Sequence, residues 1–474
     1  MTTQSGAPDA ASQVPGSRPG GLLLLGLSLG YFMVMLDTTV VTVALPAIGD
    51  TFSGSLSFLQ WVSNGYTVAF AALLLSAGVL ADRYGARRVF MIGLVAFGLL
   101  SGLSALVASV EALIVLRVML GVAGALLLPA SLAVIAHAFS DPGARAKAMG
   151  AWAAISGTAL AAGPTIGGVL TDALGWRSIF LVNVPVALVS LLITRSYAPK
   201  SPRKPGKGID LPGQVSIVVA LTSLTYGLIE SEPLGWTSPQ VVGALLVFVV
   251  AIAAFVTVET SKGNKGDEPM LPMRIFTNRI FSAGLFAGML VNFALSGLLF
   301  VLALFFQESR EYSAFMAGVA FIPLTLPPAF NPIFTGRLVA RVGPKVPSVI
   351  GFVMMAVGAF LQVPFSGNSG VDIAATVVGL LVVGFGISFA IPALMTGVVG
   401  SVPPEQSGLA SGALNSSRQT GAVLGVAILG TIMGAASSIA AGTQIALVVA
   451  GSLLLVGAAI VGIFVRKPEK AQLQ

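Results

Sequence analysis

The chain has 474 residues, of which 55% are hydrophobic and only 9% charged, and its mean hydropathy is +0.94. An average soluble domain has about 25% charged residues, so this composition excludes a soluble enzyme. If each membrane crossing takes about 20 residues, the chain is long enough for a dozen or more crossings but not for a large extramembrane domain as well. Cysteine is absent and His137 is the single histidine, which excludes disulfides, thiolate sites and a histidine metal cluster, so we expect no metal and no cofactor.

The apolar segments predict fourteen membrane-spanning helices. A first block of six is expected at residues 22–46, 58–80, 89–108, 111–138, 147–170 and 175–195. Two inserted spans follow at 212–230 and 238–260, and a second block of six is expected at 280–307, 313–336, 347–364, 372–398, 406–433 and 443–465. The first span is about 25 residues long, longer than a signal-peptide core, so we expect it to be retained.

These spans divide the chain into five parts. They are a cytoplasmic N-terminal tail (1–21), an N-terminal six-helix bundle (22–195), a basic linker with two inserted spans and a following cytoplasmic loop (196–279), a C-terminal six-helix bundle (280–465) and a cytoplasmic tail (466–474).

The basic residues indicate the orientation. Of the 25 Lys and Arg residues, 21 lie in the two tails and in every second loop, whereas Arg177 and Arg310 lie on the other face and Arg117 and Arg418 lie within spans. Cytoplasmic loops carry the excess of basic residues. We therefore expect both termini to be cytoplasmic, and orientation rather than a nucleic-acid partner explains the net charge of +7.

The glycines reveal an internal repeat. When the chain is shifted by 258 residues, nine of the 19 glycines in residues 22–195 coincide with another glycine, whereas the chain-wide frequency predicts about two. The matches run from Gly26 with Gly284 to Gly167 with Gly425, without a gap. The shift relates spans of the same orientation, so the two six-span blocks form a parallel repeat, an arrangement that places a substrate cavity between two bundles.

Asp37 is the only acidic residue well inside an otherwise uncharged predicted span. A charged side chain at the bilayer centre costs at least about 2.5 to 3.5 kcal/mol, so something must compensate it. At a rise of about 1.5 Å per residue, Asp37 and Arg117 lie about 14 and 9 Å from the outer ends of their spans. We therefore predict a pair able to load and release a proton. The alternative is a static ion pair that locks two helices together.

Polar and aromatic residues within other spans are candidates for a substrate cavity, because such sites place a few polar groups among apolar and aromatic ones. The candidates are Gln60, Trp61, Asn64, Tyr66, Asn292, Ser296, Asn415, Arg418 and Gln419. Trp61 also suits the aromatic belt at the membrane surface. Arg418 has no acidic residue nearby in its span, so either an anionic substrate group or backbone carbonyls would satisfy it.

The loop after the second predicted span carries a glycine-rich basic motif. Residues 78–88 read Gly-Val-Leu-Ala-Asp-Arg-Tyr-Gly-Ala-Arg-Arg, and the repeat copy keeps both glycines but has Ala340 in place of Asp82. Two glycines seven residues apart permit a tight turn, and the charges suit the ends of neighbouring helices. An ordinary basic loop is the alternative, but the spacing resembles the signature loop of the major facilitator superfamily. The resemblance implies a conformational role for Gly78, Asp82, Arg83, Gly85 and Arg87.

Further motifs resemble the 14-span drug:proton antiporter family. Residues 36–46 read Leu-Asp-Thr-Thr-Val-Val-Thr-Val-Ala-Leu-Pro and depart from its signature at Thr42, where Asn is usual; the motif that begins at Arg117 lacks the usual Gln. The fifth predicted span resembles the antiporter motif, with Ala159 where that motif has glycine, and its conformational residues would be Gly163, Pro164, Gly167 and Gly168. Generic small-residue packing is the alternative for these glycines. Residues 228–230 and 292–295 look most like the methylenomycin-resistance and multidrug exporter branch.

The resemblance covers essentially the whole chain and implies an all-α polytopic membrane protein with the major facilitator fold. The function it implies is proton-coupled antiport that exports small amphipathic compounds such as drugs or antibiotics, by alternating access, from the bacterial cell (inner) membrane. A functional monomer that binds substrate, protons and lipid is expected. No GxxxxGK[ST] loop is present, so ATP is not the energy source. The alternatives are a proton-coupled uptake symporter and an uncoupled facilitator for a small organic solute.

Overall fold

The computed structural model describes residues 20–203, 208, 210–265 and 269–465. The predicted tails, apart from residues 20 and 21, lie outside this part of the chain, as do Lys204 and Lys207 of the predicted linker. No strand occurs among the described residues, and the expected all-helical fold is confirmed.

The helices fall into three groups along the chain. The first group is α1 (Gly20–Phe52), α2 (Leu56–Tyr84), α3 (Ala86–Ser104), α4 (Val110–Ala138), α5 (Pro142–Leu174), α6 (Ser178–Leu181) and α7 (Asn183–Tyr197). The inserted group is α8 (Leu211–Ile229), α9 (Ser231–Leu234) and α10 (Pro239–Lys265), followed by the short helix η1 (Met273–Thr277). The last group is α11 (Arg279–Leu304), η2 (Phe305–Ser309), α12 (Ala314–Ala320), α13 (Ile322–Phe330), α14 (Pro332–Val342), α15 (Lys345–Gln362), α16 (Gly370–Val399), η3 (Pro404–Gln406), α17 (Ser407–Gly434) and α18 (Ile439–Phe464).

Local sequence sets many of these boundaries. Helices α2, α4 and α5 begin where the side chains of Ser55, Ser109 and Asp141 accept hydrogen bonds from backbone N–H groups of the first turn. Helices α2 and α14 end at Gly85 and Gly343, whose φ angles of +92° and +81° favour glycine. These two glycines are partners in the repeat, so the two copies of the loop turn in the same way.

Twelve helical segments of the described chain are long and apolar enough to cross a membrane. The predicted span at 313–336 is not one continuous helix but is divided into α12, α13 and α14. A proline stands at each division, because Pro323 lies in the first turn of α13 and Pro332 begins α14, and a proline removes a backbone donor from the helix. The predicted span at 406–433 forms α17, a helix of 28 residues that carries Arg418. The count of fourteen crossings stays a prediction.

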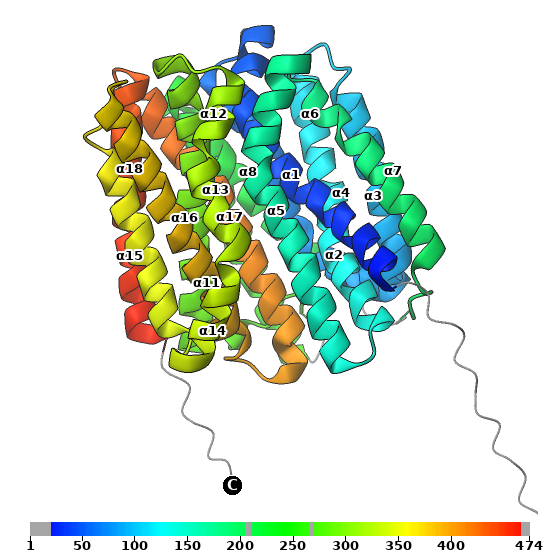
Figure 1. Ribbon diagram of the computed structural model, residues 1–474. Coiled ribbons are helices and arrows are strands. Elements are labelled where there is room, and N and C mark those ends of the chain that lie inside the picture. The colour runs from blue at the N-terminus through cyan, green and yellow to red at the C-terminus, as the bar shows by residue number, and fades with distance from the viewer. Residues whose placement is uncertain (1–19, 204–207, 209, 266–268, 466–474) are drawn as a thin grey trace, which may run out of the picture.

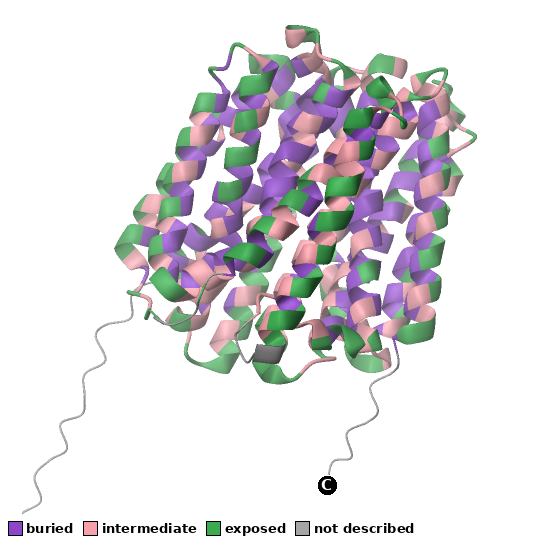
Figure 2. Ribbon diagram, turned by 180° about the vertical axis from the view of Figure 1, so that it is seen from behind, coloured by how far each residue is buried: buried purple, intermediate pink, exposed green. Residues whose placement is uncertain are grey.

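The two halves are packed in the same way. In the first half α1 packs on α5 and α3 on α4, and in the second half α11 packs on α17 and α15 on α16. The repeat glycines bring the helix pairs together: a Cβ at Gly163 would collide with Thr39 of α1, and one at Gly421 would collide with the carbonyl of Met289 of α11. Figure 2 shows buried residues along the helix faces that meet one another and exposed residues on the outside.

Figure 1 shows that α1 begins and α18 ends at the same end of the molecule, which we call the terminal end. At the other end the two halves are in contact. There Asp172 of α5 accepts hydrogen bonds from the N–H groups of Ala314 and Phe315 at 3.2 and 2.9 Å, and Gln307 donates one to the carbonyl of Val43 at 3.0 Å. Toward the terminal end α5 separates from the second half, and a Cβ at Gly150 would meet nothing within 4 Å.

Helix α8 of the inserted group lies over one line of contact between the halves, where α2 meets α17. On the α2 side, Gln214 donates to the carbonyl of Ala72 at 2.9 Å and accepts a hydrogen bond from Ser76. On the α17 side, Thr431 donates to the carbonyl of Leu228 at 3.0 Å. The insertion is therefore bound to both halves rather than lying apart from them.

Candidate functional site

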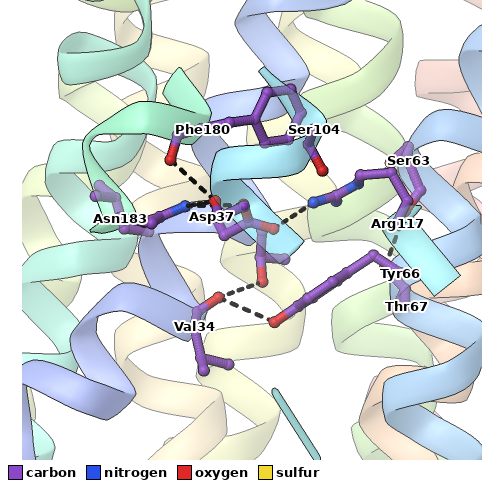
Figure 3. Close-up of polar contacts among 12 residues, drawn as sticks. Val34, Asp37, Ser63, Tyr66, Thr67, Ser104, Arg117, Phe180 and Asn183 are labelled. Atoms are coloured by element: carbon purple, nitrogen blue, oxygen red, sulfur yellow. Dashed lines mark hydrogen bonds and ion pairs between the residues drawn. The ribbon is translucent and has the colours of Figure 1, made fainter. Parts of the chain in front are cut away.

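Asp37 and Arg117 form an ion pair inside the first half. A guanidinium nitrogen of Arg117 donates to Oδ2 of Asp37, and the two side chains are 1% and 0% exposed for Arg117 and Asp37 respectively. Arg117 Nε donates to the carbonyl of Val62 at 2.9 Å, and its guanidinium lies 4.6 Å from the centre of the Tyr66 ring. Figure 3 shows Arg117 pointing from α4 toward Asp37 on α1. The ion pair therefore joins α1 to α4 within the first half.

Asn183 completes the surroundings of Asp37 and was not among the residues singled out in the sequence. Its Nδ2 donates to Oδ1 of Asp37 at 3.3 Å and to Oγ of Ser101 at 3.0 Å (Figure 3). Ser101 in turn donates to the carbonyl of Phe180 at 2.9 Å. Each carboxylate oxygen of Asp37 thus has its own donor. The available signal was a lone amide within the sixth predicted span.

A cavity lies between the two halves and has a volume of about 80 Å³ accessible to water. Helices α1, α2 and α5 line it from the first half, and α11 and α17 line it from the second. Of the predicted cavity residues it contains Asn292, Ser296, Asn415, Arg418 and Gln419. Lining residues not singled out in the sequence include Tyr31, Thr38 and Thr42, which lie at helical spacing on one face of α1.

The remaining predicted cavity residues do not line this cavity. Gln60 and Asn64 bind α17 instead, where Gln60 donates to the carbonyls of Val426 and Ala427 at 3.0 and 2.9 Å, and Asn64 donates to the carbonyl of Val423 at 3.2 Å. They hold the halves together toward the end opposite the termini. Their roles in substrate binding stay predictions for another arrangement of the halves.

Trp61 and Tyr66 also lie outside the cavity. Trp61 donates from Nε1 to Glu230 at 2.9 Å and packs against Tyr226 of α8, so it joins α2 to the inserted group. Tyr66 stacks on Arg117 and donates to the carbonyl of Val34 at 3.3 Å. Tyr66 therefore supports the ion pair.

The basic loop between α2 and α3 is tied to the chain that follows α7. The N–H of Arg87 donates to Oγ of Ser201 at 3.1 Å, and its guanidinium donates to the carbonyl of Arg195 at 2.7 Å. Arg83 lies 5.5 Å from the ring centre of Tyr84, and a Cβ at Gly78 would touch Pro129 of α4. Asp82, in the last turn of α2, lies beside these residues at the terminal end.

The glycines of α5 lie where helices approach most closely. A Cβ at Gly167 would lie 2.7 Å from the carbonyl oxygen of Val40 on α1, and one at Gly168 would collide with the carbonyl of Ala314 on α12. Gly318 of α12 meets the carbonyl of Pro164 in the same way. These residues therefore join α5 to its own half through Gly163 and Gly167 and to the other half through Gly168.

Two acidic groups are buried at the terminal end of the inserted helices. Glu259 is fully buried and accepts a hydrogen bond from the N–H of Leu271 at 2.8 Å. Asp210 accepts from the N–H of Gly213 at 2.8 Å and pairs with Lys262 at 2.9 Å. Burial opposes ionisation of Asp210, but these donors lower the pKa of its carboxyl overall. Asp37 is therefore not the only buried acid. No group of three His, Cys, Asp or Glu side chains suited to a metal occurs among the described residues.

The two similar halves, the interfacial cavity and the buried ion pair can now be compared with known proteins. The sequence matches the Major Facilitator Superfamily over residues 27–426. The chain belongs to this superfamily. It is therefore a multi-pass membrane transporter for small molecules and not an enzyme.

Among its relatives is the methylenomycin A resistance protein of Bacillus subtilis (strain 168), which is 35% identical over 94% of this chain and 95% of its own length. The tetracenomycin C resistance and export protein of Streptomyces glaucescens is 34% identical over 86% of this chain and 75% of its own length. A solved structure of a bacterial homologue of the human lysosomal transporter Spinster, inward-facing and unoccupied, has a TM-score of 0.68 at 18% identity and covers 95% of this chain and 98% of that one. That last likeness shows the shared fold.

Proposed function

We propose that this transporter exports small amphipathic compounds such as antibiotics or other drugs, in exchange for protons. The relatives named for methylenomycin A resistance and for tetracenomycin C resistance and export support the direction of transport and the class of substrate. The observation that carries proton coupling is the buried pair of Asp37 and Arg117. Intramembrane charges are costly, and those that persist commonly serve ion pathways.

Asp37 would take up a proton from outside and release it inside. In its ionised form it is held by Arg117 and Asn183, which offer donors to both of its oxygens. Protonation would weaken the bond to Arg117 and free α1 to move against α4. Each proton that moves inward along a membrane potential of 100 mV releases about 2.3 kcal/mol.

Alternating access would come from a rocking of the halves around the cavity. The contacts at Gly168 and Asp172 close the end opposite the termini, and the separation of α5 from the second half opens the terminal end. We place the terminal end in the cytoplasm of a bacterium, with fourteen spans in the inner membrane. In this proposal the protein works as a monomer and needs no cofactor.

The test uses the full chain in liposomes with an imposed pH gradient. A panel of antibiotics and fluorescent drugs is added, and both drug accumulation and proton flux are recorded. Proton-coupled export predicts that drug accumulation against its concentration gradient collapses when the pH gradient is dissipated. It also predicts that addition of the drug releases protons from the liposomes.

The alternatives predict other results. Drug and proton movement in the same direction would mean a symporter. Drug movement that ignores the pH gradient would mean a facilitator, and either result would overturn the proposal.

A further inference from the structure

Arg418 is a cation in the central cavity without an acidic partner. It lies on α17 and faces α11, where its Nε donates to Oδ1 of Asn292 at 3.1 Å. Nη1 donates to Oδ1 of Asn415 at 3.4 Å. Among the described residues no carboxylate forms an ion pair with Arg418, whereas Arg117 is paired with Asp37. The only hydrogen-bond partners that the described protein gives Arg418 are therefore neutral amides.

The guanidinium has donors left for a ligand. Arginine carries five N–H groups in a planar fork that matches a carboxylate. The contacts to Asn292 and Asn415 use two of its three nitrogens, and Nη2 donates to no protein atom among the described residues. Gly288 on α11 leaves room for the stem of Arg418, because a Cβ there would lie 3.2 Å from Cγ. The side chain is thus held by the protein while one edge stays available to the cavity.

The rest of the cavity suits an amphipathic molecule with one charged end. Apolar walls come from Leu160, Leu295 and Leu299, and hydroxyl groups come from Tyr31 and Thr38. Arg418 is the one charged residue among its lining residues in the described chain. A cation in a site of low polarity gains strongly from an anionic partner.

Comparison of the two repeats shows that the positive charge of Arg418 lies on one side of the cavity only. Shifted back by 258 residues, Arg418 corresponds to Leu160, which lines the same cavity from the first half. The first half therefore offers an apolar wall at the place where the second half offers a cation. A bound molecule with a polar end and an apolar body would be oriented by this difference.

We propose that Arg418, together with Asn292 and Asn415, forms a subsite for an anionic group of the substrate, and that the preferred substrates are amphipathic carboxylates or acids of similar charge. This inference rests on the proposed export function for its biological meaning, but the binding step can be tested without transport.

The experiment measures binding to the full chain in lipid nanodiscs. The probes are dansyl-phenylalanine, which carries a carboxylate, and dansyl-phenylalaninamide, which has the same rings without the charge. We expect the wild type to bind the carboxylate roughly 10- to 100-fold more tightly, because hydrogen bonds to charged groups are the stronger ones. Arg418→Gln should remove this preference by weakening carboxylate binding alone.

A second variant keeps Arg418 but gives it a carboxylate partner from the protein itself. Asn292→Asp places a carboxylate beside Nε, so it should raise the melting temperature and exclude the carboxylate probe while amide binding persists. Arg310→Gln is the matched control, because Arg310 also has no ion pair in the described chain, and it binds the carbonyl of Phe365 and Oγ1 of Thr376 outside the cavity. This control should keep the preference of the wild type.

Three results would overturn the subsite. They are equal binding of the two probes by the wild type, equal weakening of both probes by Arg418→Gln, and no saturable binding of either probe. A carboxylate preference that depends on Arg418, without any proton-driven transport, would leave the subsite standing and overturn the export function instead.

Discussion

The arginines within the central helices, Arg117 and Arg418, differ in what surrounds them. Arg117, in the first half, is neutralised by Asp37 and is 1% exposed. Arg418, in the second half, faces the cavity, and its hydrogen-bond partners among the described residues are neutral amides. The repeat supplies no second copy of either arginine, because Arg117 corresponds to Ala375 and Arg418 to Leu160.

In the proposed function, this difference assigns proton coupling and substrate binding to different halves. A closed ion pair responds to the gain or loss of a proton and has little to offer a ligand. An arginine without a carboxylate responds to an anion and has no acidic group to titrate. The two halves thus share their helix packing but differ in the polar residues that they carry.

The largest expected effect tests whether Asp37 alone carries the proton. Asp37→Asn keeps the shape but fixes the site neutral, so proton-driven transport should fall by at least about 100-fold, while substrate binding survives. Flux in liposomes with a pH gradient measures the first quantity, and a fluorescence titration measures the second.

Glu259→Gln is the matched comparison, because Glu259 is the other acid that is fully buried. It should retain coupled transport. If Asp37→Asn transports like the wild type and Glu259→Gln does not, the proton is carried by the inserted helices and the Asp37–Arg117 pair is structural.

A second effect concerns stability. Arg117→Ala leaves the Asp37 carboxylate buried without its cation, which should lower the free energy of unfolding by about 3 to 5 kcal/mol. Arg418→Ala removes an unpaired cation and should change it by about 1 kcal/mol or less. Denaturant titrations in micelles measure both values. Equal losses of unfolding free energy in the two variants would show that both arginines contribute equally to stability, and would contradict the difference between the paired Arg117 and the unpaired Arg418.

A smaller effect should follow from a methyl group at the contact between the halves. Gly168→Ala places a Cβ against the carbonyl of Ala314, which should destabilise the closed end by about 1 to 3 kcal/mol. Gly150→Ala is the control on the same helix, because nothing lies within 4 Å of its Cβ.

Labelling of an engineered cysteine at Ser296, with reagent added on the side opposite the termini, measures how often the closed end opens. Labelling should be faster in Gly168→Ala than in Gly150→Ala. Equal rates in the two variants would mean that this contact does not control opening.

The smallest effect concerns a residue that lies outside the cavity. Trp61→Phe removes the hydrogen bond to Glu230 and should cost about 0.5 to 1.5 kcal/mol of stability. The affinity for substrate should stay unchanged, because Trp61 does not line the cavity in this arrangement of the halves. Titration of any transported compound against both proteins checks this, and a lowered affinity would place Trp61 in the substrate path.

Much of the fold could be predicted from patterns along one helix or one repeat. Apolar length located the helices that are long enough to cross a membrane, and the position of each charge along its predicted span suggested the pairing of Asp37 with Arg117. These patterns did not determine how each helix is rotated about its axis, and so did not show which neighbour each of its faces meets. Gln60 and Asn64 lie four residues apart on one face of α2, but whether that face meets a cavity or α17 depends on how the halves dock.

Contacts between segments far apart in the sequence account for other features that the sequence did not predict. Glu259 stands near the end of an apolar span, where a solvated carboxylate is ordinary, and it is buried because Leu271 returns over it. Asn183 reaches Asp37 only because α7 begins beside α1. The prolines of 313–336 were visible, but their combined effect on α12, α13 and α14 required the neighbours that satisfy the interrupted backbone.

The position of α8 bears on where lipid tails meet the junction of the halves. Through Gln214 on one side and Leu228 on the other, this helix covers the junction of α2 with α17 and separates it from lipid tails. The opposite junction, where α5 meets α12 and α13, has no inserted helix over it in the described chain. Lipid tails would therefore border the junction of the halves directly on that flank, where the small residues Gly168 and Gly318 keep α5 and α12 in close contact.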